Sequence, residues 1–122
     1  LSPSTFECTV LYSPSAESKV SRQEISGPVI CLYPYGQIED AVTQANALPY
    51  AFQAALFSTN IDNATYAYKN LDASAVMIND HTAFRVDWMP FAGLRQSGLG
   101  VGGIPYTLRD MQIEKMMVLS VS

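Results

Sequence analysis

The sequence contains few cysteines and only one histidine, and this shortage excludes several classes of protein. Its two cysteines, Cys8 and Cys31, are too few for the disulfide framework of a small secreted domain. Neither has a second Cys or a His at the spacing of a zinc site. We therefore expect two reduced thiols and no bound metal.

Basic residues and long apolar runs are scarce as well. Seven Lys and Arg against eleven Asp and Glu give a net charge of -4, and the basic residues form no run. Because nucleic-acid affinity depends on clustered basic residues, the sequence predicts no nucleic-acid partner. No apolar stretch approaches the roughly 18 residues of a membrane helix, and residues 1–4 lack the basic start of a signal peptide. We expect a cytoplasmic protein with no membrane partner.

The centre of the chain alternates between helix-like and strand-like segments. Apolar residues recur three and four apart in residues 37–48 and 61–71, which is typical of amphipathic helices, and Asn60 is placed to cap the second one. Short apolar runs predict strands at residues 28–35, 50–57 and 73–78. This order predicts an α/β fold, a βαβαβ layer structure with a largely parallel sheet, in a single domain over residues 1–122.

Shorter elements flank this centre. Ser21 and Glu24 have the spacing of a capping box, but a Gly-Pro pair follows closely, so at most one helical turn fits there. The unbroken apolar character of residues 28–35 predicts a strand covered on both faces, with Cys31 buried inside it. Three further elements are expected: a strand at residues 5–12, a helix at residues 107–112 and a final strand at residues 115–121.

Residues 79–103 hold the only His, the only Trp and five of the seven Gly, and they follow a predicted strand. Function should be sought in this loop first. Its residues 98–103 match the dinucleotide-binding pattern G-x-G-x-x-G, but a proline follows where that fingerprint needs a helix, so we interpret them as a turn. His81 could serve in acid–base or metal chemistry, although a lone histidine in a polar loop is more often solvated, and we favour that interpretation.

Four blocks of residues resemble successive C-terminal blocks of the NAD(P)-dependent aldehyde dehydrogenases. They are EISGPV at residues 24–29, NALPY at 46–50, AVMIN at 75–79 and MPFAGLRQSGLG at 89–100. The resemblance implies the C-terminal part of that family's catalytic domain. It also implies an oxidoreductase as parent enzyme, which converts a small aldehyde to a carboxylic acid.

The family's nucleophilic Cys, its general-base Glu and its Rossmann-type cofactor domain all lie upstream of the matched region. Cys8 stands where the family commonly has Pro, and a buried Cys31 would be a poor nucleophile. We therefore expect no catalytic residue in this chain and no activity from it in isolation. The alternative is a free-standing, non-catalytic binding or interaction module derived from the same fold.

The resemblance also assigns site residues. It implies that the Glu24 carboxylate binds the hydroxyls of the nicotinamide ribose. Ser26 replaces a Phe that packs near the nicotinamide, which removes apolar surface. NAD or NADP is the cofactor in the full-length family, but we expect neither to bind this chain tightly.

Residues 81–88 would line the substrate tunnel, with Phe84, Trp88 and Phe91 as its apolar wall. Arg85 is the cation among them, and it suits a carboxylate, phosphate or phosphonate on the aldehyde; pairing with Asp87 is an equal alternative. In this family the last strand extends a neighbour's sheet, so the resemblance also implies a homodimer through residues 115–121. The alternative is a monomer whose last strand folds back on its own sheet.

Overall fold

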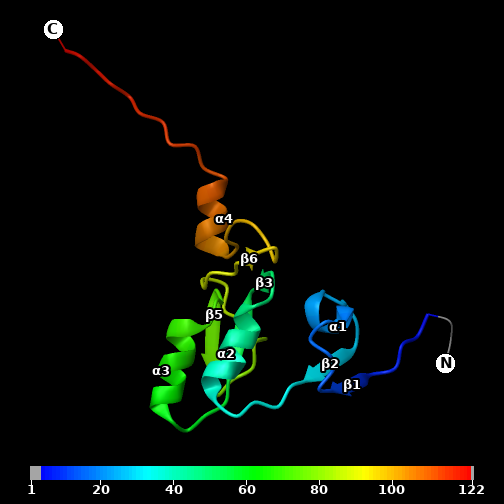
Figure 1. The fold of residues 1–122 in the computed structure, drawn as a ribbon. Coiled ribbons are helices and arrows are strands. Elements are labelled where there is room, and N and C mark those ends of the chain that lie inside the picture. The colour runs from blue at the N-terminus through cyan, green and yellow to red at the C-terminus, as the bar shows by residue number, and fades with distance from the viewer. Residues whose placement is uncertain (1–3, 122) are drawn as a thin grey trace. The chain divides into compact units, whose positions relative to one another are not determined.

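The computed structural model describes residues 4–121, and it separates two compact units, Leu1–Pro49 and Tyr50–Ser122. Figure 1 labels the helices and strands of both. The α/β class and the parallel strand pairing expected from the sequence are confirmed. Within the described residues the pairing is distributed over three two-stranded sheets, of which β1-β2 and β4-β5 are parallel and β3-β6 is antiparallel. That the two units fold as a single domain stays a prediction.

The first unit pairs β1 (Thr9–Tyr12) with β2 (Val29–Leu32) and contains α1 (Lys19–Arg22) and α2 (Ile38–Asn46). Two backbone hydrogen bonds extend the β1-β2 ladder at its ends, Thr9 N–H to Pro28 O at 2.9 Å and Ser13 N–H to Leu32 O at 2.8 Å. The amphipathic helix expected over residues 37–48 is confirmed as α2. Its apolar face buries Val42, which is 6% exposed.

Two expectations for this unit are wrong. The capping box does not form, because Ser21 lies inside α1 and Glu24 follows the end of that helix. Strand β2 is not covered on both faces either: its residues alternate between half-buried and exposed, and Ile30 is 60% exposed. A two-stranded sheet with packing on one side leaves its other face accessible, which accounts for the exposure of Ile30. Cys31 lies on the less exposed face and is half-buried rather than buried.

The second unit is built around one βαβ unit. Strands β4 (Gln53–Leu56) and β5 (Ala75–Ile78) run parallel, with Gln53 opposite Ala75, and α3 (Ile61–Asn70) connects them and packs against β5 (Figure 1). Ala67 of α3, 1% exposed, and Met77 of β5, 8% exposed, belong to the core. The predicted cap is confirmed, since Asn60 Oδ1 accepts hydrogen bonds from the backbone N–H groups of Asp62 and Asn63.

The strand expected over residues 50–57 is divided at Phe52. Its first part, β3 (Tyr50–Ala51), pairs antiparallel with β6 (Leu94–Arg95), whereas β4 pairs with β5. Phe52 O accepts both the backbone N–H and the hydroxyl of Ser74, at 2.7 and 2.8 Å. The change of pairing partner at Phe52 therefore depends on residues far along the chain.

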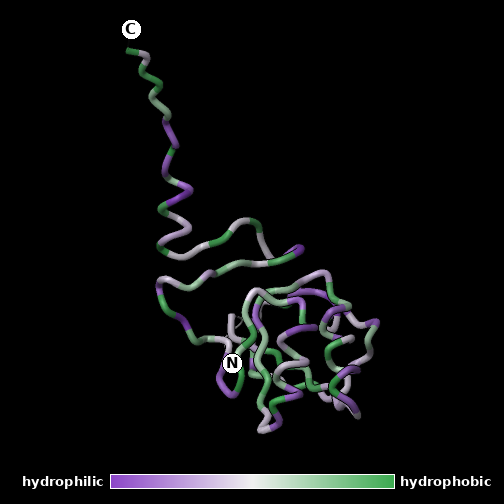
Figure 2. The backbone as a smooth tube through the Cα atoms, turned by 90° about the vertical axis from the view of Figure 1, so that its left-hand side faces the viewer, coloured by the Kyte–Doolittle hydropathy of each residue, from purple (hydrophilic) through white to green (hydrophobic). Residues whose placement is uncertain are grey.

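The C-terminal elements differ from expectation. The predicted helix at residues 107–112 is α4 (Ile104–Asp110); it begins earlier because Gly103 turns the chain at φ 115° and a proline suits the first helical turn. Residues 115–121 form no strand in the described structure, since a strand needs a partner backbone. The apolar residues near this end are visible in Figure 2, and Met117 is 85% exposed.

Each helix in residues 4–121 is too short or too polar to cross a membrane.

Candidate functional site

The candidate loop begins where β5 ends. Asn79 adopts a left-handed backbone at φ 58° and donates its N–H to Leu56 O at 2.8 Å. Its side-chain Oδ1 accepts from Ser58 N–H at 2.8 Å, and its Nδ2 donates to Ser58 O at 2.9 Å. Asn79 therefore joins the ends of β4 and β5 at the point where the loop leaves the sheet. Sequence reasoning did not identify it, although an Asn directly after a strand is a recognisable signal for a left-handed turn.

Two tight turns shape the loop itself. Phe84 N–H donates to His81 O and Met89 N–H donates to Val86 O, each at 3.1 Å. The far end is fixed by reciprocal backbone hydrogen bonds between Phe91 and Gly102, at 3.0 and 2.8 Å. Side chains on residues 84–91 are therefore presented by a loop that is anchored at both ends.

Arg85 and Phe91 are brought together within this loop. The guanidinium carbon of Arg85 lies 4.3 Å from the centroid of the Phe91 ring, a cation–π contact. Phe91 also meets Phe52 edge to face, with ring centroids 4.8 Å apart and an interplanar angle of 87°. The ion pair with Asp87 that the sequence left open does not form within residues 4–121. An aromatic face, and not a carboxylate, therefore holds Arg85.

The other expected members of the apolar wall lie in the same loop with more exposure. Phe84 is 47% exposed and Trp88 is 72% exposed, whereas Phe91 is 42% exposed. In the described part of the chain the one aromatic pair is Phe52–Phe91, so neither Phe84 nor Trp88 stacks on it. The structure brings Phe91 and Arg85 into contact and leaves Phe84 and Trp88 at the surface.

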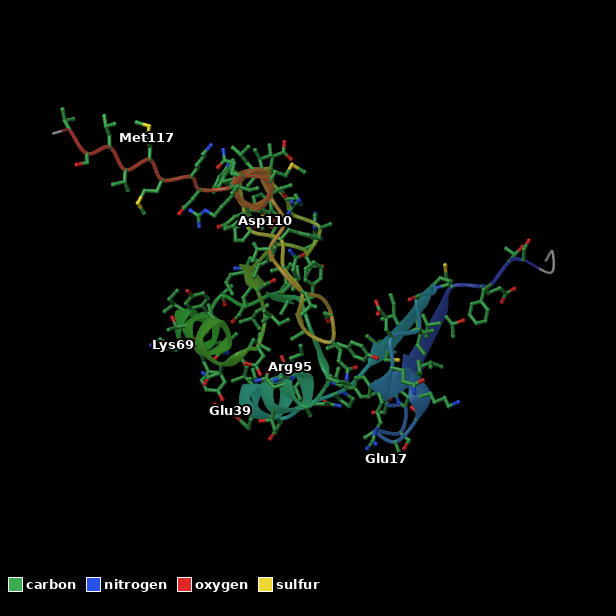
Figure 3. The ribbon with its side chains drawn as sticks, turned by 90° about the horizontal axis from the view of Figure 1, so that it is seen from above. Glu17, Glu39, Lys69, Arg95, Asp110 and Met117 are labelled. Carbon is green, nitrogen blue, oxygen red and sulfur yellow. The ribbon has the colours of Figure 1, made fainter. Side chains whose placement is uncertain are left out.

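Two of the other arginines form ion pairs. Arg22 binds the Glu17 carboxylate at 2.5 Å and donates from Nε to Ala16 O at 2.9 Å. Arg95, labelled in Figure 3, binds Asp72. Arg85 has no carboxylate partner among residues 4–121, so its charge is less compensated than theirs. It is the cation best placed to receive an anionic group at this loop.

The expected cofactor residues lie in the first unit, after α1. Glu24 is exposed, and its carboxylate is accessible to hydroxyl donors, which fits the ribose role. Ser26 is also exposed and has φ 53°, and its short polar side chain offers no apolar face to a nicotinamide ring. The exposed carboxylate of Glu24 can therefore accept hydrogen bonds from ribose hydroxyls, whereas Ser26 provides no apolar surface for a nicotinamide ring.

A cavity of about 450 Å³ opens in the first unit, and sequence reasoning did not predict it. The hydroxyls of Ser21 and Tyr33 meet in its lining at 2.6 Å. Its lining residues are Ala16, Ser21, Arg22, Tyr33, Tyr35, Ala41, Gln44, Ala45, Ala47 and Leu48. Glu24 and Ser26 are not among them, so the cavity is separate from the expected cofactor contacts.

The other two motifs of the loop, His81 and the glycines at residues 98–103, form no further candidate site among the described residues. His81 is exposed, with Nε2 3.9 Å from Asp80 Oδ1, in keeping with a solvated side chain. Groups of three or more metal-ligating side chains are absent from residues 4–121. The glycines at residues 98–103 form bends and the bridge to Phe91. The expectation that a proline excludes a helix after them is wrong, because Pro105 lies in the first turn of α4, where its missing N–H costs no hydrogen bond.

Comparison with known proteins finds similar sequences that match most of the chain. The model of the aldehyde dehydrogenase family matches residues 3–117. The 3-sulfolactaldehyde dehydrogenase of Priestia aryabhattai is 33% identical over 113 residues, which cover 93% of this chain and 24% of that protein. The lactaldehyde dehydrogenase of Methanococcus maripaludis is 40% identical over 103 residues, which cover 84% of this chain and 22% of that protein.

Solved structures agree with the sequence matches. The NADP-dependent glyceraldehyde-3-phosphate dehydrogenase of Bacillus halodurans, solved in complex with NADP, has a TM-score of 0.84 and 32% sequence identity. The match covers 93% of this chain and 24% of that one. The chain thus spans about a quarter of the length of the relatives that it matches.

Proposed function

Because the chain belongs to the aldehyde dehydrogenase family, we propose that it supplies the C-terminal part of the catalytic domain of an NAD(P)-dependent enzyme. The parent reaction is oxidation of an aldehyde to a carboxylic acid. The match over 93% of this chain but 24% of a relative supports this assignment to one part of a larger catalytic unit. The isolated chain is inactive in this account, because it holds neither the nucleophile nor the general base.

The cofactor contact assigned to this chain is that of Glu24. Its exposed carboxylate accepts hydrogen bonds from the ribose hydroxyls of NAD or NADP, and the nicotinamide, when bound, supplies the hydride acceptor. Ser26 contributes no ring contact, so the affinity of the chain alone for either cofactor is weak. A relative solved in complex with NADP supports the cofactor class.

Recognition of the substrate is assigned to the loop that carries Arg85, Trp88 and Phe91. The single observation behind this assignment is the Arg85 guanidinium, held on the Phe91 ring 4.3 Å away and without a carboxylate partner among the described residues. A guanidinium in that position binds a planar or tetrahedral anion through several N–H donors. We therefore propose an aldehyde with a carboxylate, phosphate, phosphonate or sulfonate group at its other end.

The relatives support this substrate class in part. The names 3-sulfolactaldehyde and glyceraldehyde-3-phosphate each denote an aldehyde with an anionic group, whereas lactaldehyde carries none. Arg85 therefore serves to select a charged aldehyde in this account, with Phe84 and Trp88 completing the apolar side of the pocket when the rest of the catalytic domain is present.

Residues 115–121 are assigned to association. Val118 is 84% exposed and Leu119 is 75% exposed, and Figure 3 shows side chains projecting on both sides of the backbone around the labelled Met117. An unpaired apolar segment binds another strand readily. We propose that these residues pair between two copies in a homodimer.

A cytoplasmic location stays a proposal, supported by the free thiols of Cys8 and Cys31.

Nuclear magnetic resonance of the single tryptophan tests the substrate assignment. The Trp88 indole N–H gives one side-chain signal, which can be followed during titration with sulfoacetate, phosphoglycolate and the neutral glycolamide. We expect saturable shifts with the two anions at millimolar affinity, equivalent to about 4 kcal/mol, and none with glycolamide. Arg85→Gln should abolish the shifts, and Arg109→Gln, on α4, should retain them. Equal shifts in Arg85→Gln would contradict the assignment.

A non-catalytic interaction module derived from the same fold is the second candidate. The observation that favours it is Ser26, which provides no apolar face for the nicotinamide. This candidate predicts a dimer that binds neither the anionic compounds nor NAD, so the titration above separates the two functions.

A further inference from the structure

Asn79 makes three hydrogen bonds to the end of the neighbouring strand. Its backbone N–H binds Leu56 O, and its carboxamide binds both the N–H and the C=O of Ser58, all within 2.9 Å. The two side-chain bonds are reciprocal, so one donor and one acceptor of the main chain are satisfied by one amide group. The turn at φ 58° is one that Asn adopts more readily than most residues.

These contacts matter because the loop that follows has few other attachments. Within the described structure, residues 80–90 form hydrogen bonds only with residues 80–104, such as Ile104 N–H to Asp87 O at 3.0 Å. The aromatic contact of Phe91 with Phe52 comes only at the far end. Beyond the last pair of the β4–β5 ladder, Leu56 opposite Ile78, the hydrogen bonds of Asn79 are therefore the ones that join the start of the loop to the end of β4.

We infer that Asn79 is the positioning residue of the substrate-recognition loop, acting through the main chain of Ser58. This inference rests on the proposed function, since it gives Asn79 the task of placing Arg85 where it meets the anionic group. The geometry requires an Asn: Asp lacks the donor for Ser58 O, Gln is one methylene too long, and Gly provides the turn without the two bonds. The hydroxyl of Ser58 takes no part, because both partners belong to its backbone.

The test compares four variants by two measurements. Asn79→Gly keeps the left-handed turn and deletes both side-chain bonds, and Asn79→Asp keeps the acceptor and deletes the donor. Ser58→Ala keeps both backbone partners. Asn70→Gly is the matched control, because it deletes another exposed amide bond, Asn70 Nδ2 to Tyr66 O at 2.8 Å, away from the loop. Time-resolved anisotropy of Trp88 measures the order of the loop, and the indole shift measures sulfoacetate affinity.

We expect Asn79→Gly to lose the slowly decaying anisotropy of Trp88 and to bind sulfoacetate about tenfold more weakly, while its helical circular dichroism is unchanged. Asn79→Asp should lie between Asn79→Gly and the parent, and Ser58→Ala and Asn70→Gly should match the parent. Parent-like anisotropy in Asn79→Gly would overturn the inference. If Asn79→Gly fails to fold, parent-like anisotropy in Asn79→Asp overturns it and a reduced value supports it.

The two measurements separate this inference from the proposed function. If the parent chain binds no sulfoacetate, anion recognition at Arg85 fails, but the anisotropy of Trp88 still decides whether Asn79 positions the loop.

Discussion

The guanidinium of Arg85 lies over one face of the Phe91 ring, and the ring of Phe52 meets Phe91 edge to face. The three side chains connect the candidate substrate loop to the junction of β3 and β4. The ring quadrupole attracts the cation without neutralising it, so the N–H donors at the edge of the guanidinium stay available. Phe91 thus both orders Arg85 and leaves its charge usable by a ligand.

Replacing Phe91 tests this arrangement. Phe91→Leu removes the cation–π contact and the edge-to-face pair, which together should lower the free energy of unfolding by about 1–2 kcal/mol. Urea denaturation followed by Trp88 fluorescence provides the measurement. Phe57→Leu is the control, because Phe57 is 69% exposed and should cost no more than about 0.5 kcal/mol. Equal losses in the two variants would show that the ring contacts contribute nothing.

Gly103 is a position where a side chain cannot fit. Its φ of 115° is rarely adopted by other residues, and a Cβ there would lie 2.6 Å from Met89 O. Gly103→Ala should therefore destabilise the second unit by at least about 2 kcal/mol. Gly98→Ala is the matched control, because its Cβ would meet only ordinary contacts, the nearest at 3.5 Å. Similar melting temperatures for the two variants would contradict this account of the turn before α4.

The affinity of the chain for NAD should be low, because Ser26 replaces a Phe that would pack near the nicotinamide. Calorimetry of the chain with NAD should give a dissociation constant in the millimolar range or weaker, equivalent to no more than about 4 kcal/mol. Ser26→Phe should strengthen binding by restoring apolar surface, and Glu24→Gln should weaken it in that background. Micromolar binding by the parent chain, or no response to either substitution, would count against the assigned contacts.

Association should depend on the C-terminal segment. Light scattering of the intact chain should give a dimer, and a variant ending at Glu114 should be monomeric, because it lacks the exposed apolar residues 115–121. Met117→Lys would place a charge in the segment and should also favour the monomer. A monomeric intact chain, or a dimer that survives the truncation, would refute pairing through these residues.

The parts of the fold that local sequence determines could be predicted. Apolar spacing located α2 and α3, and Asn60 marked the start of α3 through its capping bonds. The short apolar runs around them predicted the β4–α3–β5 unit. Such signals depend on residues within one or two turns of each other.

The parts that could not be predicted depend on distant or missing partners. The break at Phe52 arises because Tyr50 pairs with Arg95 while Gln53 pairs with Ala75. The Asn79–Ser58 contact joins residues 21 positions apart. Residues 115–121 have the composition of a strand, but within residues 4–121 they pair with no other strand. Of the candidate site, Arg85, Trp88 and Phe91 could be named from the sequence. The role of Asn79 and the Arg85–Phe91 contact could not, because both depend on how the chain folds.

The central claim is that this chain contributes binding surfaces to aldehyde oxidation but none of its chemistry, and an assay of the purified chain tests it most directly. The assay records NAD(P)H absorbance with NAD or NADP and each of 3-sulfolactaldehyde, lactaldehyde and glyceraldehyde-3-phosphate. We predict no aldehyde-dependent increase for the chain or for its Cys8→Ala and Cys31→Ala variants. A turnover that disappears with either cysteine substitution would contradict the claim.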